Sequence, residues 1–343
     1  MAKKIKVAVL MGGASGEREV SLASGMAAVQ ALTANKKFEV LPIEITKQGK
    51  WLARPVKLVV SSQEPVVRGN ALVPIKQKEL SGKIDVAFIA MHGKGGEDGT
   101  IQAVLELLKI PYTGSGVLAS ALGMDKVRSL ALFRDAGMRV PDYTVVSSQG
   151  AVVRGKKTAD FPVVTKPNYH GSSLGVSICR NKKELKQGIV LAKKYNKDVI
   201  VQQFIDGIEL TCAVLGNEHP KALPVVEIIA NKGEFYDYAS KYEEEGSDHI
   251  IPARIPKTVE KLVTEWAIKA HTVIGCRGFS RTDFIWGSPH FAKASRGQNL
   301  YVLEINTIPG LTPTSLFPDA ARGAGYDFSE LIEKLIHLAL GGK

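Results

Sequence analysis

The chain has 343 residues, of which 45% are apolar and 23% are charged, a composition typical of a globular protein with room for two or three domains. Its three cysteines, Cys179, Cys212 and Cys276, are widely spaced, so the sequence predicts neither a disulfide framework nor a C-x-x-C metal site. A core of the expected size needs no such crosslinks, and free thiols fit a reducing cytosol.

The formal net charge of +11 comes from 45 Lys and Arg against 34 Asp and Glu. Such an excess is compatible with nucleic acid, which would then bind in a salt-sensitive manner. The lysines nevertheless occur in small groups, with no Arg-rich arm and no aromatic residues among them. This pattern favours scattered surface charge, and no nucleic-acid partner is expected.

The N-terminus begins with basic residues, but the apolar run that follows is too short for a signal peptide. No other stretch reaches the length of a membrane span. We therefore expect a cytoplasmic protein that binds no membrane.

Strand-like and helix-like patterns alternate over the first hundred residues, which predicts a parallel sheet with βαβ crossovers. The strand patterns lie at 6–13, 38–45 and 85–93, and the helical patterns at 19–32 and 99–109. An insert at 54–79, rich in Pro, Val and Lys, is expected to form a separate hairpin. The turn-like PYTGSG at 111–116 predicts a first domain boundary.

Several helices are expected further along the chain. Two of them lie between Val117 and Gly137, a glycine suited to the position after a helix. Asn181 and Glu184 resemble a capping box at the start of another helix. A fourth helix is expected from Lys257 to Gly275.

The second half of the chain is also rich in β patterns. Runs at 199–205, 209–216 and 222–229 are separated by turns, and we predict that they form an antiparallel meander. Two further strands are expected at 279–287 and 299–307.

These last two strands carry polar residues where a buried strand would be apolar. Glu304 and Asn306 are two residues apart and project to the same face, as do Arg281 and Asp283. A connection of roughly 15 residues containing Gly and Pro suits a hairpin that brings the two pairs together. Converging carboxylates need a cation, and oxygen ligands without His or Cys favour magnesium. A surface hairpin with its polar residues in water remains the alternative.

A glycine-rich loop follows Lys166, with Gly171, Ser172, Ser173 and Gly175. Small residues let backbone N–H groups approach phosphate oxygens, and Lys166 could add a positive charge. The loop is not a Walker motif, because no G-K-[ST] opens a helix there. A plain turn would have a similar sequence, so the loop supports phosphate binding only together with the oxygen ligands downstream.

Short motifs in a specific order resemble a known family. The chain is similar to the ATP-grasp ligases, and within them to the D-alanine:D-alanine ligase family, from about Lys4 to Leu340. The motifs are GGASGEREVS at 12–21, HGKGGEDGT at 92–100, YTGSG at 112–116, MDKVRS at 124–129, KPNYHGSSLG at 166–175, YDYASKY at 236–242, SRTDF at 280–284 and EINTIPGLTPTSL at 304–316.

The resemblance implies an α/β protein with the ATP-grasp fold, preceded by a Rossmann-like domain with a parallel sheet. The expected division is a substrate and dimerisation domain at 1–116, a central ATP-grasp subdomain at 117–201, and a C-terminal ATP-grasp subdomain at 202–343. The resemblance also implies a homodimer formed through the N-terminal domain.

The implied reaction makes D-alanyl-D-alanine for peptidoglycan precursors. ATP phosphorylates one D-alanine carboxylate, the amine of a second D-alanine attacks the acyl phosphate, and phosphate leaves. Asp283, Glu304 and Asn306 would hold two Mg²⁺ or Mn²⁺ ions on the ATP phosphates. Arg281 would stabilise the oxyanion of the tetrahedral intermediate and help bind the second carboxylate.

Seven residues match nucleotide-binding positions of the family: Lys126, Lys166, Ser173, Gln202, Phe204, Glu209 and Lys241. The lysines and the serine would face the phosphates, although any one lysine considered alone is better explained as a surface residue. Glu209 would bind the ribose, and Phe204 lies in the segment that holds adenine. Gln202 departs from the Glu that the family commonly has there. A Gln carbonyl accepts the same bond from the adenine amino group, so ATP remains the expected nucleotide.

The first D-alanine would be bound by Glu17 through its ammonium group, in a network with Ser172 and Tyr242. An acid in a first helical turn can also merely complement the helix dipole. A hydroxyl at Tyr242 accompanies amino-acid acceptors in the family, which favours a dipeptide product. Ala239 and Ser240 replace the Glu and Ala of the usual YDYEAKY, and this change bears on loop closure.

The second D-alanine would be bound by Ser315 and Arg281 through its carboxylate, with Gly310 in the same pocket. His92 faces this region by analogy and has no assigned catalytic step. The alternatives are a ligase that uses D-serine or D-lactate as acceptor, or a non-catalytic nucleotide-binding protein with this fold.

Overall fold

Three β-sheets, a separate two-stranded hairpin and the helices packed on them make up the described part of the chain in this computed structural model. The structure describes residues 3–54, 56–60, 65–69, 72–147, 150–152, 160–230, 246–287 and 299–341. The helices are α1 (Arg18–Ala34), α2 (Thr100–Leu107), α3 (Val117–Met124), α4 (Lys126–Asp135), α5 (Lys182–Lys193), α7 (Lys257–Ile274), α8 (Leu316–Gly323) and α9 (Phe328–Ala339), with a short 3₁₀ helix at Gln77–Leu80.

The first sheet has the strand order β6-β3-β2-β1-β7. Its strands are β1 (Ile5–Gly12), β2 (Phe38–Ile45), β3 (Trp51–Ala53), β6 (Val73–Ile75) and β7 (Val86–Ile89). Both β2 and β7 pair parallel to β1, and α1 packs on β1 and β2. The predicted parallel sheet is therefore confirmed for these strands. The predicted hairpin of the insert is confirmed by the antiparallel pair β4 (Val56–Val60) and β5 (Pro65–Gly69), but the insert is not wholly separate, because β6 within it pairs with β3 in the first sheet.

The second sheet is antiparallel, with the order β11-β10-β12-β8-β9 and α5 packed on three of its strands. Its strands are β8 (Tyr143–Ser147), β9 (Gly150–Val152), β10 (Val163–Pro167), β11 (Ser177–Cys179) and β12 (Val199–Gln203). Asn181 is the N-cap of α5 and accepts from two backbone N–H groups. Glu184 accepts from the N–H of Arg180 instead of the N-cap, so the capping box is incomplete.

The third sheet has the order β16-β15-β13-β17-β18, with β14 attached to β13. Its strands are β13 (Gly207–Gly216), β14 (Lys221–Ala222), β15 (Val226–Ala230), β16 (Ser247–Ile250), β17 (Gly278–Gly287) and β18 (Leu300–Asn306). The predicted hairpin of the last two strands is confirmed, since β17 and β18 pair antiparallel. The helices expected at 117–137 and 257–275 are also confirmed by α3, α4 and α7.

The predicted three-stranded meander is wrong in one strand. β12 pairs with β10 and β8 in the second sheet, whereas β13 and β15 pair with each other as expected. Four of the five residues of β12 are buried, so the strand has no alternating pattern that would indicate its partners. The chain leaves one sheet after β12 and enters the other at β13.

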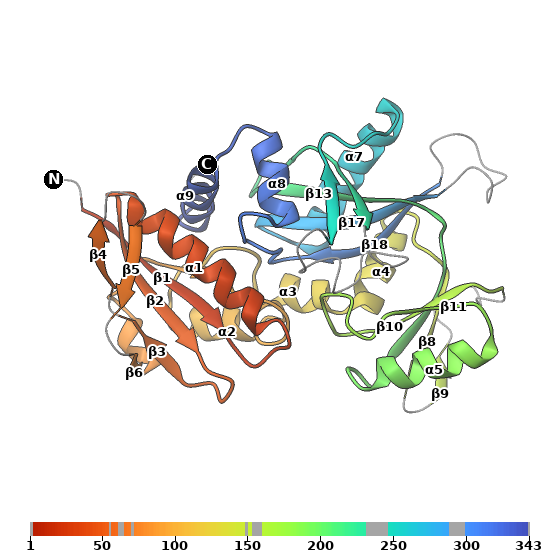
Figure 1. Cartoon of the computed structure of the whole chain (residues 1–343), viewed down its shortest axis with the longest axis horizontal. Coiled ribbons are helices and arrows are strands. Elements are labelled where there is room, and N and C mark those ends of the chain that lie inside the picture. The colour runs from red at the N-terminus through yellow and green to blue at the C-terminus, as the bar shows by residue number, and fades with distance from the viewer. Residues whose placement is uncertain are drawn as a thin grey trace.

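The last helix, α9, returns to the first sheet, whereas α8 packs on β13 of the third sheet. Leu331, Leu335 and Ile336 of α9 share a core with β1, β2 and β7, and Figure 1 shows α9 beside α1, at the end of the molecule opposite α5. Glu333 accepts from Asn35 and pairs with Lys37 just after α1. The last helix of the chain therefore packs against the first one. The domain division at residues 116 and 201 stays a prediction.

No helix in the described ranges is both long enough and apolar enough to cross a membrane.

His271 gives the stability of this fold a predictable pH dependence. The side chain is buried in α7, its Nδ1 lies 2.8 Å from Ser280 Oγ, and burial lowers its pKa to about 4. Below pH 6.5 the unfolded chain binds a proton that the native protein does not, so stability falls as the pH falls. Between pH 7 and pH 5 we expect the native protein to lose about 2 kcal/mol of unfolding free energy from this group.

Chemical denaturation of the native protein and of His271→Gln at both pH values measures this contribution. The other titrating groups are common to both proteins and cancel in the difference. Equal losses in the two proteins would contradict the prediction.

Candidate active site

A pocket of about 1010 Å³, counting its part open to solvent, lies between the second and third sheets. One wall comes from β10, β11 and β12, and the other from β13, β17 and β18. Eight of the predicted site residues line it: Lys126, Lys166, Ser173, Gln202, Phe204, Glu209, Asp283 and Glu304. Residues from positions 126 to 304 thus meet in one cavity because two separate sheets face each other.

The hairpin of β17 and β18 places two carboxylates opposite each other. Asp283 pairs in register with Glu304, Arg281 pairs with Asn306, and a β-bulge follows Asp283. Both acids line the pocket, and the hairpin brings the two polar pairs together as the sequence predicted.

Each carboxylate is bound by a positively charged side chain. Arg281 donates from Nε and Nη2 to the two oxygens of Asp283, at 2.9 and 2.8 Å, and Thr211 Oγ1 donates to the same group at 2.6 Å. Lys126 Nζ lies 3.1 Å from Glu304 Oε2. Such pairing is what permits two acids to remain in a partly buried site.

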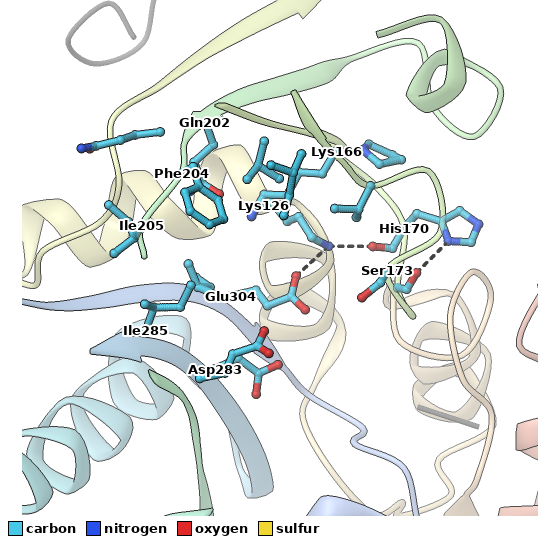
Figure 2. A pocket seen from close by; sticks show the side chains of 18 of the residues that line it. Lys126, Lys166, His170, Ser173, Gln202, Phe204, Ile205, Asp283, Ile285 and Glu304 are labelled. Atoms are coloured by element: carbon cyan, nitrogen blue, oxygen red, sulfur yellow. Dashed lines mark hydrogen bonds and ion pairs between the residues drawn. The ribbon is translucent and has the colours of Figure 1, made fainter. Parts of the chain in front are cut away.

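The two lysines of the pocket come from outside the hairpin. Lys126 is the first residue of α4, and its Nζ also donates to the carbonyl of His170 at 2.6 Å. Lys166 lies on β10 and is 7% exposed, and burial lowers its pKa to about 8 against the opposing effect of Glu304. A phosphate group in the pocket would meet both positive charges (Figure 2).

The oxygen donors fit a hard divalent cation. Asn306 lines a smaller adjoining pocket together with Glu304, and its Oδ1 accepts from the N–H of Ile308 at 3.1 Å. Within the described ranges no three His, Cys, Asp or Glu side chains gather into a metal-binding group. The candidate set has two carboxylates and an amide, which are ligands suited to magnesium.

The other end of the pocket is largely apolar. Figure 2 shows Gln202, Phe204 and Ile205 near one another, on the far side of Lys126 from Ser173. Gln202 is 3% exposed, and its Nε2 has no hydrogen-bond partner among the described residues. Glu209 pairs in register with Ile228 and Ile285, two further residues of the wall. A flat ring fits such a slot, with a few polar groups to orient it.

The glycine-rich loop connects this pocket to α1. Glu17 is the N-cap of α1, and Ser172 Oγ donates to its Oε1. A Cβ at Gly171 would lie 2.9 Å from Glu17 Oε2, so only glycine allows this close approach. Oε2 itself is buried and has no hydrogen-bond partner among the described residues. The backbone at Ser172 and Ser173 has positive φ, which shapes the turn.

The remaining predicted residues lie beside the loop that follows β18. Ser315 is the N-cap of α8, and its Oγ lies 2.6 Å from Thr312 Oγ1. Gly310 packs so closely on Ser315 that a Cβ there would lie 2.8 Å from the hydroxyl. His92 is buried and contacts the same loop through the carbonyl of Ile308. Lys241 and Tyr242 lie outside the described residues.

Sequence reasoning missed two groups of the site. Thr211 binds Asp283 and lies two residues from Glu209 on the same strand face, a spacing that could have identified it. Glu97 lines the smaller pocket and accepts from the N–H of Gly93. Burial, with the nearby charge of Glu17, raises the pKa of Glu97 to about 8. It lies in the motif at 92–100, where no role was assigned to it.

Two family models match nearly the whole chain. The model described as "D-ala D-ala ligase N-terminus" matches residues 6–115, and "D-ala D-ala ligase C-terminus" matches residues 132–337. The chain belongs to the D-alanine:D-alanine ligase family. A D-alanine--D-alanine ligase of Desulforamulus reducens is 44% identical over 98% of this chain and 99% of its own length. Another from Halalkalibacterium halodurans is 40% identical over 98% of this chain and 99% of its own length.

Solved structures give the same result for the fold. The VanG D-Ala:D-Ser ligase of Enterococcus faecalis is 33% identical with a TM-score of 0.78, over 98% of this chain and all of that one. The D-alanine-D-alanine ligase of Coxiella burnetii is 26% identical with a TM-score of 0.77, over 99% and 95% of the two chains. The expected α/β class and ATP-grasp fold are thereby confirmed.

Proposed function

We propose that this protein joins two D-alanine molecules in an ATP-dependent reaction, through a D-alanyl phosphate, to supply D-alanyl-D-alanine for peptidoglycan precursors. The observation that carries the proposal is the pairing of Asp283 with Glu304 across from Lys126 and Lys166 in one pocket, in a chain of this family. Phosphoryl transfer depends mainly on such positioning and charge neutralisation.

ATP would lie along the pocket between the two sheets. Its base would enter the slot beside Gln202 and Phe204, its ribose would bind Glu209, and its phosphates would face the two lysines and Ser173. Lys241 would join them from the segment outside the described residues. The apolar end and the basic end of the pocket support this orientation.

Two Mg²⁺ or Mn²⁺ ions would be held by Asp283, Glu304 and Asn306. When bound, these ions neutralise phosphate charge and orient the transferred phosphoryl group. The chain's own part is to hold two carboxylates at one end of the pocket. Lys126 and Arg281, which now bind these acids, would then be available to the phosphates and the substrate.

The donor D-alanine would bind through its ammonium group to Glu17. The buried Oε2 of Glu17, which lacks a partner among the described residues, supports this role, since a buried carboxylate oxygen needs a donor. Ser172 holds the other oxygen of Glu17, and Tyr242 would complete the network. The donor carboxylate then attacks the γ-phosphorus of ATP, and ADP leaves.

The acceptor D-alanine would bind through its carboxylate to Ser315 and Arg281, beside Gly310, with His92 behind the loop. Its amine attacks the acyl carbon of the D-alanyl phosphate, and the C–O bond to phosphate breaks. The planar guanidinium of Arg281 would stabilise the oxyanion that forms in this step.

We further propose a cytoplasmic homodimer that binds neither nucleic acid nor membrane, with the three-part division at residues 116 and 201. Leu107 of α2, which is 85% exposed and lies within 1–116, offers an apolar side chain for a subunit contact. Sedimentation of a single 37.0 kDa species would contradict the dimer.

Phosphate release from ATP tests the reaction directly. We expect release with D-alanine and none above background with L-alanine, because Glu17 would bind the ammonium group of the donor and Arg281 the carboxylate of the acceptor, which fixes the orientation of both substrates. Mixtures of D-alanine with D-serine or D-lactate test the acceptor, and dipeptide should predominate at neutral pH. Faster formation of D-alanyl-D-serine or of depsipeptide would assign a different acceptor.

ATP binding should weaken as the pH rises through 8. Lys166 has a pKa of about 8, so its charge is present below this pH and lost above it. Relative to pH 7, the dissociation constant at pH 9 should be about tenfold higher. The variant Lys166→Arg keeps its charge over this range and should bind ATP with little pH dependence. Calorimetric titration measures the dissociation constant of ATP for both proteins. The same pH dependence of this constant in the two proteins would contradict the role of Lys166.

Metal binding should depend on Asp283 and not on a comparable acid elsewhere. Glu227 is likewise a carboxylate bound by an arginine, Arg254, but it lies outside the pocket. With a nucleotide bound, Asp283→Asn should weaken Mn²⁺ binding by at least roughly tenfold, as loss of even an outer-shell group does. Glu227→Gln should leave it unchanged. Mn²⁺ titration followed by electron paramagnetic resonance gives the Mn²⁺ dissociation constants of the native protein and of both variants. Equal Mn²⁺ affinities in the native protein and Asp283→Asn would show that Asp283 is not a ligand.

A further inference from the structure

Ser24 connects three segments that are far apart in the sequence. It lies in α1 with no exposed surface, and its Oγ lies 2.9 Å from Nε2 of His92, which follows β7. The same Oγ accepts from the backbone N–H of Leu311 at 3.3 Å. His92 Nδ1 lies 3.1 Å from the carbonyl oxygen of Ile308.

The direction of each hydrogen bond follows from the chemistry of the groups. A carbonyl oxygen only accepts, so His92 Nδ1 carries a proton and donates to Ile308. Burial lowers the pKa of His92, so the ring is neutral and its Nε2 accepts. Ser24 therefore donates its single hydroxyl proton to His92, and its lone pairs accept from Leu311. Every group in this chain of bonds has a matched partner.

The two contacted backbone groups flank the turn that contains Gly310. Ile308 is held by its carbonyl and Leu311 by its N–H, so the turn is fixed at both ends. Gly310 packs directly against the hydroxyl of Ser315, and Thr312 N–H donates to that hydroxyl at 3.2 Å. The position of Ser315 thus depends on the turn, and the turn depends on Ser24 and His92.

The same hydrogen-bond network also positions Glu17, which would bind the donor D-alanine. Ser15 Oγ donates to the backbone carbonyl of His92 at 2.7 Å and accepts from the N–H of Glu17 at 3.0 Å. Glu17 occupies the N-cap position of α1, and Ser24 lies seven residues further on the same helix, close to two full turns away. One helix therefore fixes both Glu17 and the loop that carries Gly310 and Ser315.

We propose that Ser24 is a positioning residue that sets the acceptor D-alanine at a fixed distance from the donor. This role rests on the proposed function, because Glu17 and Ser315 hold the two substrates there. A displacement of about 1 Å between reacting groups is enough to slow a reaction strongly, and the hydroxyl of Ser24 prevents such a displacement.

The test compares Ser24→Ala with Ser21→Ala, a matched control one turn earlier on α1. Ser21 is equally buried and also binds two backbone groups, Gly12 N–H and the carbonyl of Ala90, but it does not contact the 308–311 turn. Rates at saturating ATP over a wide range of D-alanine give separate Michaelis constants for donor and acceptor, and rates at varied ATP give KM for ATP. Ser24→Ala should raise the acceptor constant about tenfold and leave KM for ATP unchanged. Ser21→Ala should change neither constant.

Hydrogen exchange of the peptide that spans 308–311 gives a second measurement, independent of catalysis. Ser24→Ala should lose protection there, and Ser21→Ala should not. If Ser24→Ala does not fold, Ser24→Cys serves instead, since its thiol is a weak donor of similar size and should give an intermediate acceptor constant.

Two results would overturn the proposal: an acceptor constant in Ser24→Ala equal to that of the control, or a parallel rise in all the constants. If the native protein does not turn over D-alanine, the proposed function fails. The exchange measurement then still decides whether Ser24 holds the turn.

Discussion

The site depends on two carboxylates held opposite each other on neighbouring strands. Asp283 and Glu304 are register partners, and like charges this close repel strongly where water is scarce. The chain meets this repulsion with a cation for each acid: Arg281 binds Asp283 through two N–H groups, and Lys126 binds Glu304. The same concentration of charge suits the hairpin to divalent ions that carry a polyphosphate.

The positive groups around these acids come from elements that approach the hairpin from different directions. Lys126 starts α4, and Lys166 lies on a strand of the opposite sheet. Burial makes the charge of Lys166 costly, which lowers its pKa toward the neutral range. An anionic ligand between the sheets would restore that charge. Ligand binding and protonation are thus coupled in this pocket.

The return of the chain to its first sheet connects the hairpin with α1. After β18 the chain passes His92 and Ser24, forms α8, and ends in α9 against α1. Glu17, at the start of α1, meets Ser172 from the glycine-rich loop. Groups that would bind two substrates are therefore attached to one helix, and the packing of α9 on that helix stabilises the arrangement.

The sequence by itself determined the local elements and the chemical types of the site, because strand alternation, helix caps and i, i+2 spacing depend on near neighbours. It predicted the parallel strands, the N-cap at Asn181 and the common face of Glu304 and Asn306. It assigned 199–205 to the wrong sheet, since a strand buried on both faces has no pattern that indicates its partners. Only the tertiary structure decided which distant side chains meet, because such contacts depend on how the sheets and helices pack. These contacts are Lys126 with Glu304, Ser172 with Glu17, Thr211 with Asp283 and Ser24 with His92.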